Sequence, residues 1–305
     1  MKVVHITKDS KYMKPLLLIK KDHTELLTNS SLMIIKGEVG SGKSRIAMNF
    51  MVGFSGVQED LEFEYTACPD GKHVIYISTE MSRYHLQKRL LKILEFTPKE
   101  YEDKLVFLDA MQLDDKLADL EDICQKFPPH VLIIDQLGDL VIDINNIQQA
   151  TDIIKKLSNG LDKYDCGIIG IVHQNEDAGI NAKARGHLGS LFEQKVVSSI
   201  AISDNSKGYK IKTTKVREGK PIQIDAIFNE KTSMLKRIEI PKDNELVSKI
   251  TPYLPCNRSN LYEQIKVLTK KTSPTTLKEI TNRLLSEGYI KEEIKGKSSI
   301  ISLNN

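Results

Sequence analysis

The feature that most constrains this chain is one glycine-rich segment, Gly37-Glu38-Val39-Gly40-Ser41-Gly42-Lys43-Ser44. It matches G-x-x-x-x-G-K-[ST] at every defined position. An apolar run, Leu32–Lys36, precedes it, and a helical pattern over Lys43–Phe54 follows it directly. Between a strand and a helix, such a loop surrounds phosphate groups with backbone N–H groups, and the helix N-terminus adds positive partial charge. The segment therefore predicts an α/β core built around a phosphate site.

We call residues 37–44 the P-loop and expect all of them to contact a nucleotide. Lys43 should contact the β- and γ-phosphates, and Ser44 should place its hydroxyl on Mg²⁺. The expected ligands are therefore ATP and Mg²⁺. The alternative is a glycine turn without a ligand, and the strand and helix on its two sides argue against that alternative.

Two further segments end in a carboxylate where a strand is expected to end. Val131–Asp135 is an apolar run, typical of a strand covered on both faces. Asp135 would then lie at the C-terminal edge of a parallel sheet and hold Mg²⁺, directly or through water. Val74–Glu80 ends in Ser-Thr-Glu, and Glu80 could accept a proton from the attacking water. The alternative for Glu80 is an acid in the first turn of a helix that follows Ser82.

The patterning divides the chain into two domains. Over residues 1–240 we expect a mostly parallel sheet with helices on both faces, because strands alternate with helices. Strands are also expected over Leu61–Ala67 and His73–Ser78, on either side of a turn at Pro69-Asp70-Gly71. Antiparallel strands at the sheet's edge are predicted at 196–203, 209–215, 222–229 and 234–240. Residues 241–244 are typical of a linker, and 245–305 form a second, small domain.

The second domain has the pattern of a winged helix-turn-helix. Three helices are expected at 246–254, 259–269 and 273–286, followed by a hairpin of 289–294 and 298–303. In a DNA-binding winged helix, the third helix would face base edges and the hairpin tip would touch the backbone. The candidate DNA contacts here are Lys271, Thr275, Thr276, Lys278, Arg283, Lys295 and Lys297. The alternative is a winged helix used for protein contacts.

Charge and composition are compatible with DNA binding but do not decide it. Residues 241–305 hold 11 Lys+Arg and 7 Asp+Glu, a net of +4, whereas residues 1–240 hold 33 and 34, a net of −1. A basic small domain suits nucleic acid, although an ordinary solvated surface explains it equally. The four cysteines form no C-x-x-C pair, so neither zinc nor a disulfide framework is indicated. The sequence shows no apolar run long enough for a membrane span and no signal-peptide pattern at its start, so we expect a cytoplasmic protein without a membrane partner.

The order of these elements resembles the RecA-like ATPases, and in particular the RepA/DnaB group of hexameric replicative helicases. The resemblance covers about residues 15–240. It rests on the P-loop, a strand ending Ser-Thr-Glu, an Ile-Ile-Asp strand, and a strand ending His173-Gln174. It implies that Glu80 is the catalytic glutamate and that Gln174 is a polar sensor of the γ-phosphate.

Two later segments extend the resemblance and imply a ring. Arg185–Ser190 is similar to the family's Arg-Gly-Ser segment, and Lys215-Val216-Arg217-Glu218-Gly219 resembles its K-x-R-x-G element. In that family the Lys and Arg reach the nucleotide of the neighbouring subunit, where an arginine stabilises charge on the phosphates. Lys215 and Arg217 alternate correctly to share one face of a strand. The alternative is an exposed basic edge strand.

The chain also departs from this family. We expect it to lack the N-terminal domain that DnaB helicases use for assembly, and a winged helix is not a fixed part of the RepA/DnaB core. The segment 176–184 is short, with Lys183 and Arg185 as the basic residues around it, which are candidate DNA contacts.

We therefore expect an oligomeric, DNA-directed ATPase, close to plasmid or phage replicative helicases. One alternative is a loader or regulatory ATPase that binds DNA through its winged helix without unwinding it. Another is a DNA-binding regulator that uses nucleotide only as a structural ligand.

Overall fold

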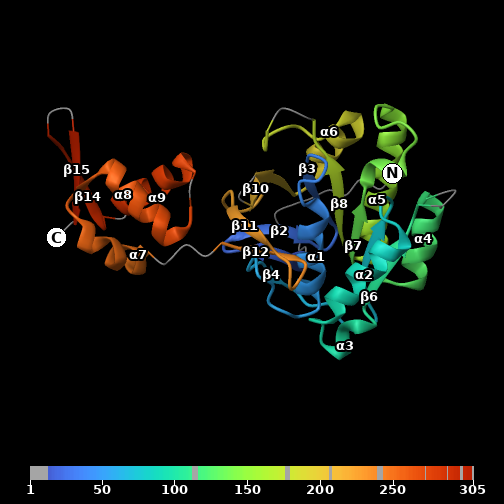
Figure 1. Cartoon of the computed structure of the whole chain (residues 1–305). Coiled ribbons are helices and arrows are strands. Elements are labelled where there is room, and N and C mark those ends of the chain that lie inside the picture. Colours follow the sequence, from blue (N-terminus) through green and yellow to red (C-terminus); the bar gives the residue numbers. More distant parts are fainter. Residues whose placement is uncertain are drawn as a thin grey trace. The chain divides into compact units, whose positions relative to one another are not determined.

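A computed structural model describes residues 13–111, 116–175, 179–205, 208–238, 243–271, 273–286, 288–295 and 298–303. The chain divides into two compact units, Met1–Arg237 and Ile238–Asn305. Each unit is described by itself below (Figure 1).

In the described residues of the first unit, the central sheet has nine strands in the order β12-β11-β10-β9-β3-β8-β7-β5-β6. Six of them are parallel to their neighbours: β3 (Ser31–Gly37), β5 (His73–Ser78), β6 (Leu105–Asp109), β7 (Pro129–Asp135), β8 (Gly167–His173) and β9 (Ser198–Asn205). The antiparallel edge consists of β10 (Gly208–Val216), β11 (Gln223–Asn229) and β12 (Met234–Arg237). The sheet is therefore mostly parallel with an antiparallel edge, as predicted, except that β9 pairs parallel with β3 and the antiparallel part begins at β10.

The central sheet has an apolar core on each face because side chains alternate along its strands. In β3, Met33 and Ile35 join the core of one face, and Leu32 and Ile34 join the other. The first face is covered by α1 (Lys43–Phe54) and α2 (Arg83–Leu94). The second face is covered by α4 (Lys116–Lys126), α5 (Ile147–Tyr164) and α6 (Gly186–Lys195). Two short helical segments complete the unit, α3 (Lys99–Glu102) and η1 (Leu137–Leu140).

A second, three-stranded sheet in this unit was not predicted. Its order is β2-β1-β4, from β1 (Leu17–Lys21), β2 (Thr24–Thr28) and β4 (Glu64–Tyr65). The expected strand over residues 61–67 is thus wrong for most of its length. The reason is Glu59, whose carboxylate accepts hydrogen bonds from the backbone N–H of Leu61 at 2.6 Å and of Phe63 at 2.8 Å. These bonds hold the chain in a loop, and only two residues pair with β1.

One side chain ties the helix after the P-loop to the last strand of the central sheet. The amide of Asn49 in α1 donates to the carbonyl of Leu235 at 2.8 Å and accepts from its N–H at 3.0 Å. Asn49 is fully buried, and it pairs with β12 as another strand would. The position of α1 is therefore fixed by the distal edge strand as well as by β3.

The second unit has its own core. Its elements are α7 (Asp243–Ile250), η2 (Thr251–Tyr253), β13 (Cys256–Asn257), α8 (Arg258–Thr269), α9 (Pro274–Ser286), β14 (Ile290–Lys295) and β15 (Ser298–Leu303). The strands pair in the order β13-β15-β14, and β13 was not predicted. Leu261, Ile265, Leu277 and Leu284 of α8 and α9 are buried against Ile301 of β15. Within the described residues of both units, no helix is long and apolar enough to cross a membrane.

Candidate functional site

The P-loop runs from the end of β3 to the start of α1 and forms a narrow backbone cradle. Gly42, which caps α1, has φ of 95°, and a Cβ there would lie 2.8 Å from the ring of Tyr209. The hydroxyl of Ser41 is buried and has no hydrogen-bond partner among the described residues. An orphaned hydroxyl beside a helix N-terminus fits a loop that receives an anionic ligand.

The side chain of Lys43 is buried and points back into the P-loop. Its Nζ donates to the carbonyls of Gly37 at 3.1 Å and Glu38 at 2.7 Å, and lies 3.1 Å from Nδ1 of His173. Burial lowers the pKa of Lys43, against the opposing charges of Asp135 and Glu80. The ammonium is thus held at the loop, with two carboxylates facing it.

Asp135 lies at the end of β7 in a nearly dry environment, with 3% of its surface exposed. Its carboxylate accepts hydrogen bonds from the hydroxyls of Tyr76 and Ser44. Burial raises the pKa of Asp135, and these two hydrogen bonds oppose that rise. Ser44 and Asp135 therefore supply adjacent oxygens of the kind that Mg²⁺ prefers, and these two residues would hold the ion.

Tyr76 was not predicted as part of the site. It lies in β5, is fully buried, and reaches Asp135 from the neighbouring strand. The sequence offered one signal for it: a tyrosine in an otherwise apolar parallel strand, whose buried hydroxyl needs a hydrogen-bond partner.

Glu80 follows β5, and its side chain is 49% exposed. Its Oε1 lies 3.4 Å from Nε2 of His173. The hydrogen bond from His173 holds the pKa of Glu80 below its usual range; burial opposes this effect, and the charge of Lys43 adds to it. Glu80 is therefore an anionic base on the strand next to that of Asp135, facing the same lysine.

Gln174 and His173 are neighbours at the end of β8 and make different contacts. Gln174 is buried, and its side-chain amide donates to the carbonyl of Gly179 at 3.2 Å. The backbone N–H of Gln174 donates to the carbonyl of Gly37 in the P-loop at 3.2 Å. His173, one residue earlier, is the side chain that joins Lys43 and Glu80. Successive residues of a strand face opposite sides, so the two side chains point away from each other.

Lys215 and Arg217 hold the end of α6. The Nζ of Lys215 donates to the carbonyls of Glu193 at 2.5 Å and Gln194 at 3.0 Å, and Nη2 of Arg217 donates to that of Lys195 at 3.4 Å. Burial lowers the pKa of Lys215, and the charge of Arg217 adds to that effect. Cations at a helix C-terminus satisfy its last carbonyls and oppose its dipole.

Lys183 and Arg185 are exposed on the segment before α6. Lys183 lines a hollow of about 550 Å³ together with Lys36, Lys212 and Lys215. Arg185 lines a separate cavity of about 140 Å³ that His173 also borders. The first hollow also contains Glu193, which forms an ion pair with Lys36, and the second places an arginine near the ATPase site.

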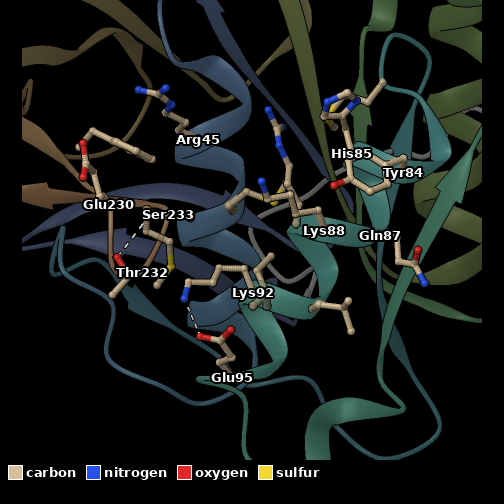
Figure 2. Close-up of a pocket in the computed structure, with 17 residues that line it drawn as sticks. Arg45, Tyr84, His85, Gln87, Lys88, Lys92, Glu95, Glu230, Thr232 and Ser233 are labelled. Carbon is tan, nitrogen blue, oxygen red and sulfur yellow. Dashed lines mark hydrogen bonds and ion pairs between the residues drawn. The ribbon is translucent and has the colours of Figure 1, made fainter.

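A further hollow lies between α1, α2 and the turn from β11 to β12. It measures about 820 Å³, and Figure 2 shows Arg45, Lys88 and Glu230 entering it from these three elements. The guanidinium of Arg45 lies over the ring of Phe228, 3.9 Å from its centre. Arg45 directly follows Ser44, so a cation–π pair borders the P-loop helix, on a surface that suits a flat aromatic ring.

The structure separates the candidate DNA contacts in the second unit. Thr275 and Lys278 are exposed on α9, whereas Thr276 and Arg283 are partly buried. Lys271 is buried, with 8% of its surface exposed. Lys297 and the side chain of Lys295 lie outside the described residues.

Together, the P-loop, its lysine, the Ser44–Asp135 pair and the nearby glutamate define the site of a P-loop ATPase. A family model described as an AAA domain matches residues 18–179, which is more than half of the chain. The chain therefore belongs to this AAA-domain family. The matched segment contains the P-loop, Glu80, Asp135 and His173, and it ends before Lys215, Arg217 and the second unit. A search of curated proteins found no match.

Proposed function

We propose that this P-loop ATPase is an oligomeric, DNA-directed motor with a RecA-like core, of the plasmid or phage replicative helicase kind. The proposal rests on which strand supplies the catalytic acid. Asp135 is followed by Gln136, so β7 supplies no second acid directly after its Mg²⁺ ligand. Glu80 comes from the end of the neighbouring strand β5 and faces Lys43.

In the proposed mechanism, each residue of the site has a separate role in ATP hydrolysis. Lys43 binds the β- and γ-phosphates after exchanging its present partners. Ser44 and Asp135 hold Mg²⁺, which neutralises charge on the phosphate oxygens. Glu80 accepts a proton from water and aligns that water with the γ-phosphate. In this scheme the base of ATP lies against the Arg45–Phe228 pair, and Gln174 transmits the state of the P-loop to the segment that starts at Asn175.

The proposal requires assembly into a ring, for which a hexamer is the expected form. Lys215 and Arg217 lie at the end of β10 and just beyond it, where they bind α6 carbonyls with side chains that remain partly or largely exposed. A neighbour's triphosphate offers these cations a stronger partner than a carbonyl, because its negative charge adds Coulomb attraction to the hydrogen bond. Arg217 then acts as a finger in the adjacent site.

The second unit supports a DNA partner. Its order of helix, short strand, two helices and hairpin is compatible with a winged helix-turn-helix, in which α9 would be the recognition helix. Thr275 and Lys278 are exposed on α9 and suit contacts with base edges or phosphates. The winged helix would bring the motor to DNA, and the segment that carries Lys183 and Arg185 would follow a single strand.

A second candidate is a loader or regulatory ATPase that binds DNA without unwinding it. The contacts of Lys215 and Arg217 with α6 favour it, because they give these residues a role inside one subunit. A strand-displacement assay on a tailed duplex, run beside an ATPase assay, separates the two. The motor displaces the strand with ATP and not with a non-hydrolysable analogue. Hydrolysis without displacement would support the loader or regulator.

A further inference from the structure

His173 connects two residues of the ATPase site that lie on different elements. At the end of β8, its Nδ1 is 3.1 Å from Nζ of Lys43, and its Nε2 is 3.4 Å from Oε1 of Glu80. Its side chain is 23% exposed, so the ring is partly enclosed by the site. Neither the P-loop motif nor the catalytic scheme assigns it a task.

One neutral form of the ring satisfies both contacts. The ammonium of Lys43 can only donate, so Nδ1 must accept. The carboxylate of Glu80 can only accept, so Nε2 must carry the proton and donate. The hydrogen bonds therefore run in one direction, from Lys43 through the ring to Glu80.

Binding of a phosphate group changes the first of these hydrogen bonds, the one from Lys43 to His173. An ammonium has three N–H donors, and Lys43 uses them on Gly37, Glu38 and His173. A phosphate oxygen that contacts Lys43 must replace at least one of these partners. Two are carbonyls of the loop itself, whereas His173 belongs to another strand, β8, and contacts Lys43 only through its side chain.

Glu80 needs an orienting partner because its side chain is half exposed. A glutamate at the surface samples many rotamers, and holding it in one costs conformational entropy. Misplacing a catalytic group by about 1 Å can cost about 100-fold in rate. A donor on the rigid end of β8 fixes the carboxylate without contacting the substrate.

We propose that His173 is a positioning residue that links the P-loop to Glu80. Its Nε2–H orients the Glu80 carboxylate, and its Nδ1 loses the Lys43 donor when phosphate binds. The inference rests on the proposed catalytic role of Glu80 and adds to it a connection between nucleotide binding and the base.

Two amide substitutions separate the two ring nitrogens. The amide of glutamine reaches about as far as Nε2, and that of asparagine about as far as Nδ1, so His173→Gln keeps a donor for Glu80 and His173→Asn does not. We expect kcat of the full chain, without DNA, to fall about 10-fold or more in His173→Asn and His173→Ala. It should stay within about 3-fold of wild type in His173→Gln, and all three should bind an ATP analogue within about 3-fold of wild type. His23→Ala, in the exposed turn between β1 and β2, is the matched control and should change neither quantity.

Equal kcat values in His173→Gln and His173→Asn, at any level, overturn the inference, because only the Nε2 contact distinguishes them. Weakened analogue binding in all three variants also overturns it, since the residue would then bind nucleotide directly. Glu80→Gln is measured in parallel. If Glu80→Gln still hydrolyses ATP, the catalytic role of Glu80 fails; if it is inactive while His173→Asn is fully active, only the role of His173 fails.

A second measurement tests whether Lys43 gives up its hydrogen bond to His173 when nucleotide binds. In protein labelled with ¹⁵N-histidine, the ring signals of His173 are identified by their loss in His173→Gln. The Nδ1 signal should shift when a non-hydrolysable ATP analogue binds. An unchanged signal at saturating analogue would show that His173 keeps its Lys43 partner, and would overturn the link to nucleotide binding.

Discussion

At the residue scale, the lysine of the P-loop is already fully hydrogen-bonded before any phosphate arrives. Its two loop carbonyls and His173 occupy all three donors of a buried ammonium. Nucleotide binding is therefore an exchange of partners, in which neutral acceptors give way to charged ones. The gain comes from the difference between these partners, since hydrogen bonds to charged groups contribute more than neutral ones.

Lys43→Ala should lose tight binding of ATP with Mg²⁺ and all turnover. Removing one charge-assisted contact from a preformed cradle should raise Kd on the order of 100-fold. Titration with a fluorescent ATP analogue measures the change, and Lys99→Ala, on the exposed surface of α3, is the control. Wild-type affinity in Lys43→Ala would be incompatible with the assigned phosphate site.

Glu80→Gln should bind ATP normally and hydrolyse it poorly. The amide has the same size and can still contact water, but it cannot accept a proton, so kcat should fall by about 10²- to 10⁴-fold. A phosphate-release assay gives kcat, and Glu100→Gln on α3 controls for loss of a surface charge. Turnover near the wild-type rate would reduce Glu80 to a structural acid.

The residues that could be predicted are those whose position follows from the end of a local element. The P-loop lies where a strand meets a helix. Asp135 ends β7 and Glu80 follows the end of the neighbouring strand β5, at the same edge of the sheet. Tyr76 and His173 were missed because their contacts depend on which face of a strand each side chain occupies. That choice is set by register and by the helices on each face, which a single sequence pattern leaves open.

At the element scale, the Lys-x-Arg-x-Gly segment is anchored to the small sheet. Gly219 has φ of 102°, and a Cβ there would lie 2.5 Å from Cα of Thr24 in β2. The hydroxyl of Thr24 donates to the carbonyl of Lys220 at 2.6 Å and accepts from its N–H at 3.1 Å. Close packing against β2 therefore explains why a glycine is needed at position 219. The same contact fixes the position of the backbone that follows Lys215 and Arg217. Sequence patterning missed β2 because Thr24–Thr28 is short and half polar.

Gly219→Ala should destabilise the first unit by more than Gly71→Ala does. Both glycines have positive φ, but a Cβ at Gly71 would meet open space. Gly71→Ala therefore measures only the cost of placing alanine at positive φ, about 1 kcal/mol. The close approach to β2 should raise the loss at Gly219 to about 2–4 kcal/mol. Urea unfolding of the two variants gives the difference. Equal losses would mean that the segment shifts freely away from β2.

At the scale of the whole molecule, the chain consists of two units with separate cores. The family match and the ATPase residues lie entirely in the first. The proposed contacts with duplex DNA lie mostly in the second. The two activities should therefore separate when the chain is cut between them.

Deleting residues 238–305 should leave a folded ATPase that binds duplex DNA more weakly. The loss should reflect Lys278 and its neighbours on α9, so Lys278→Ala in the full chain should weaken binding in the same direction by a smaller amount. Both are measured at one fixed salt concentration, because phosphate contacts depend steeply on salt. Undiminished DNA affinity after the deletion would assign the second unit to protein contacts.

Arg217→Ala should bind ATP almost normally and hydrolyse it poorly, if Arg217 completes the site of a neighbour. Specific activity of the wild type should then rise with protein concentration. A mixture of Lys43→Ala and Arg217→Ala subunits should recover activity, because the first retains Arg217 and the second retains the P-loop. If the mixture stays inactive while mass measurement confirms co-assembly, Arg217 serves only as a cap for α6.

The pair of hydrogen bonds between Asn49 and Leu235 gives the first unit a mechanical property. The chain leaves this unit just after β12, which ends at Arg237. Tension applied at residue 238 is therefore carried by the β11–β12 hydrogen bonds, by the contacts of Arg237 with Asp60 and Glu62, and by Asn49. Asn49 lies in the helix that begins at Lys43, so a pull on the second unit is delivered to the helix that holds the P-loop.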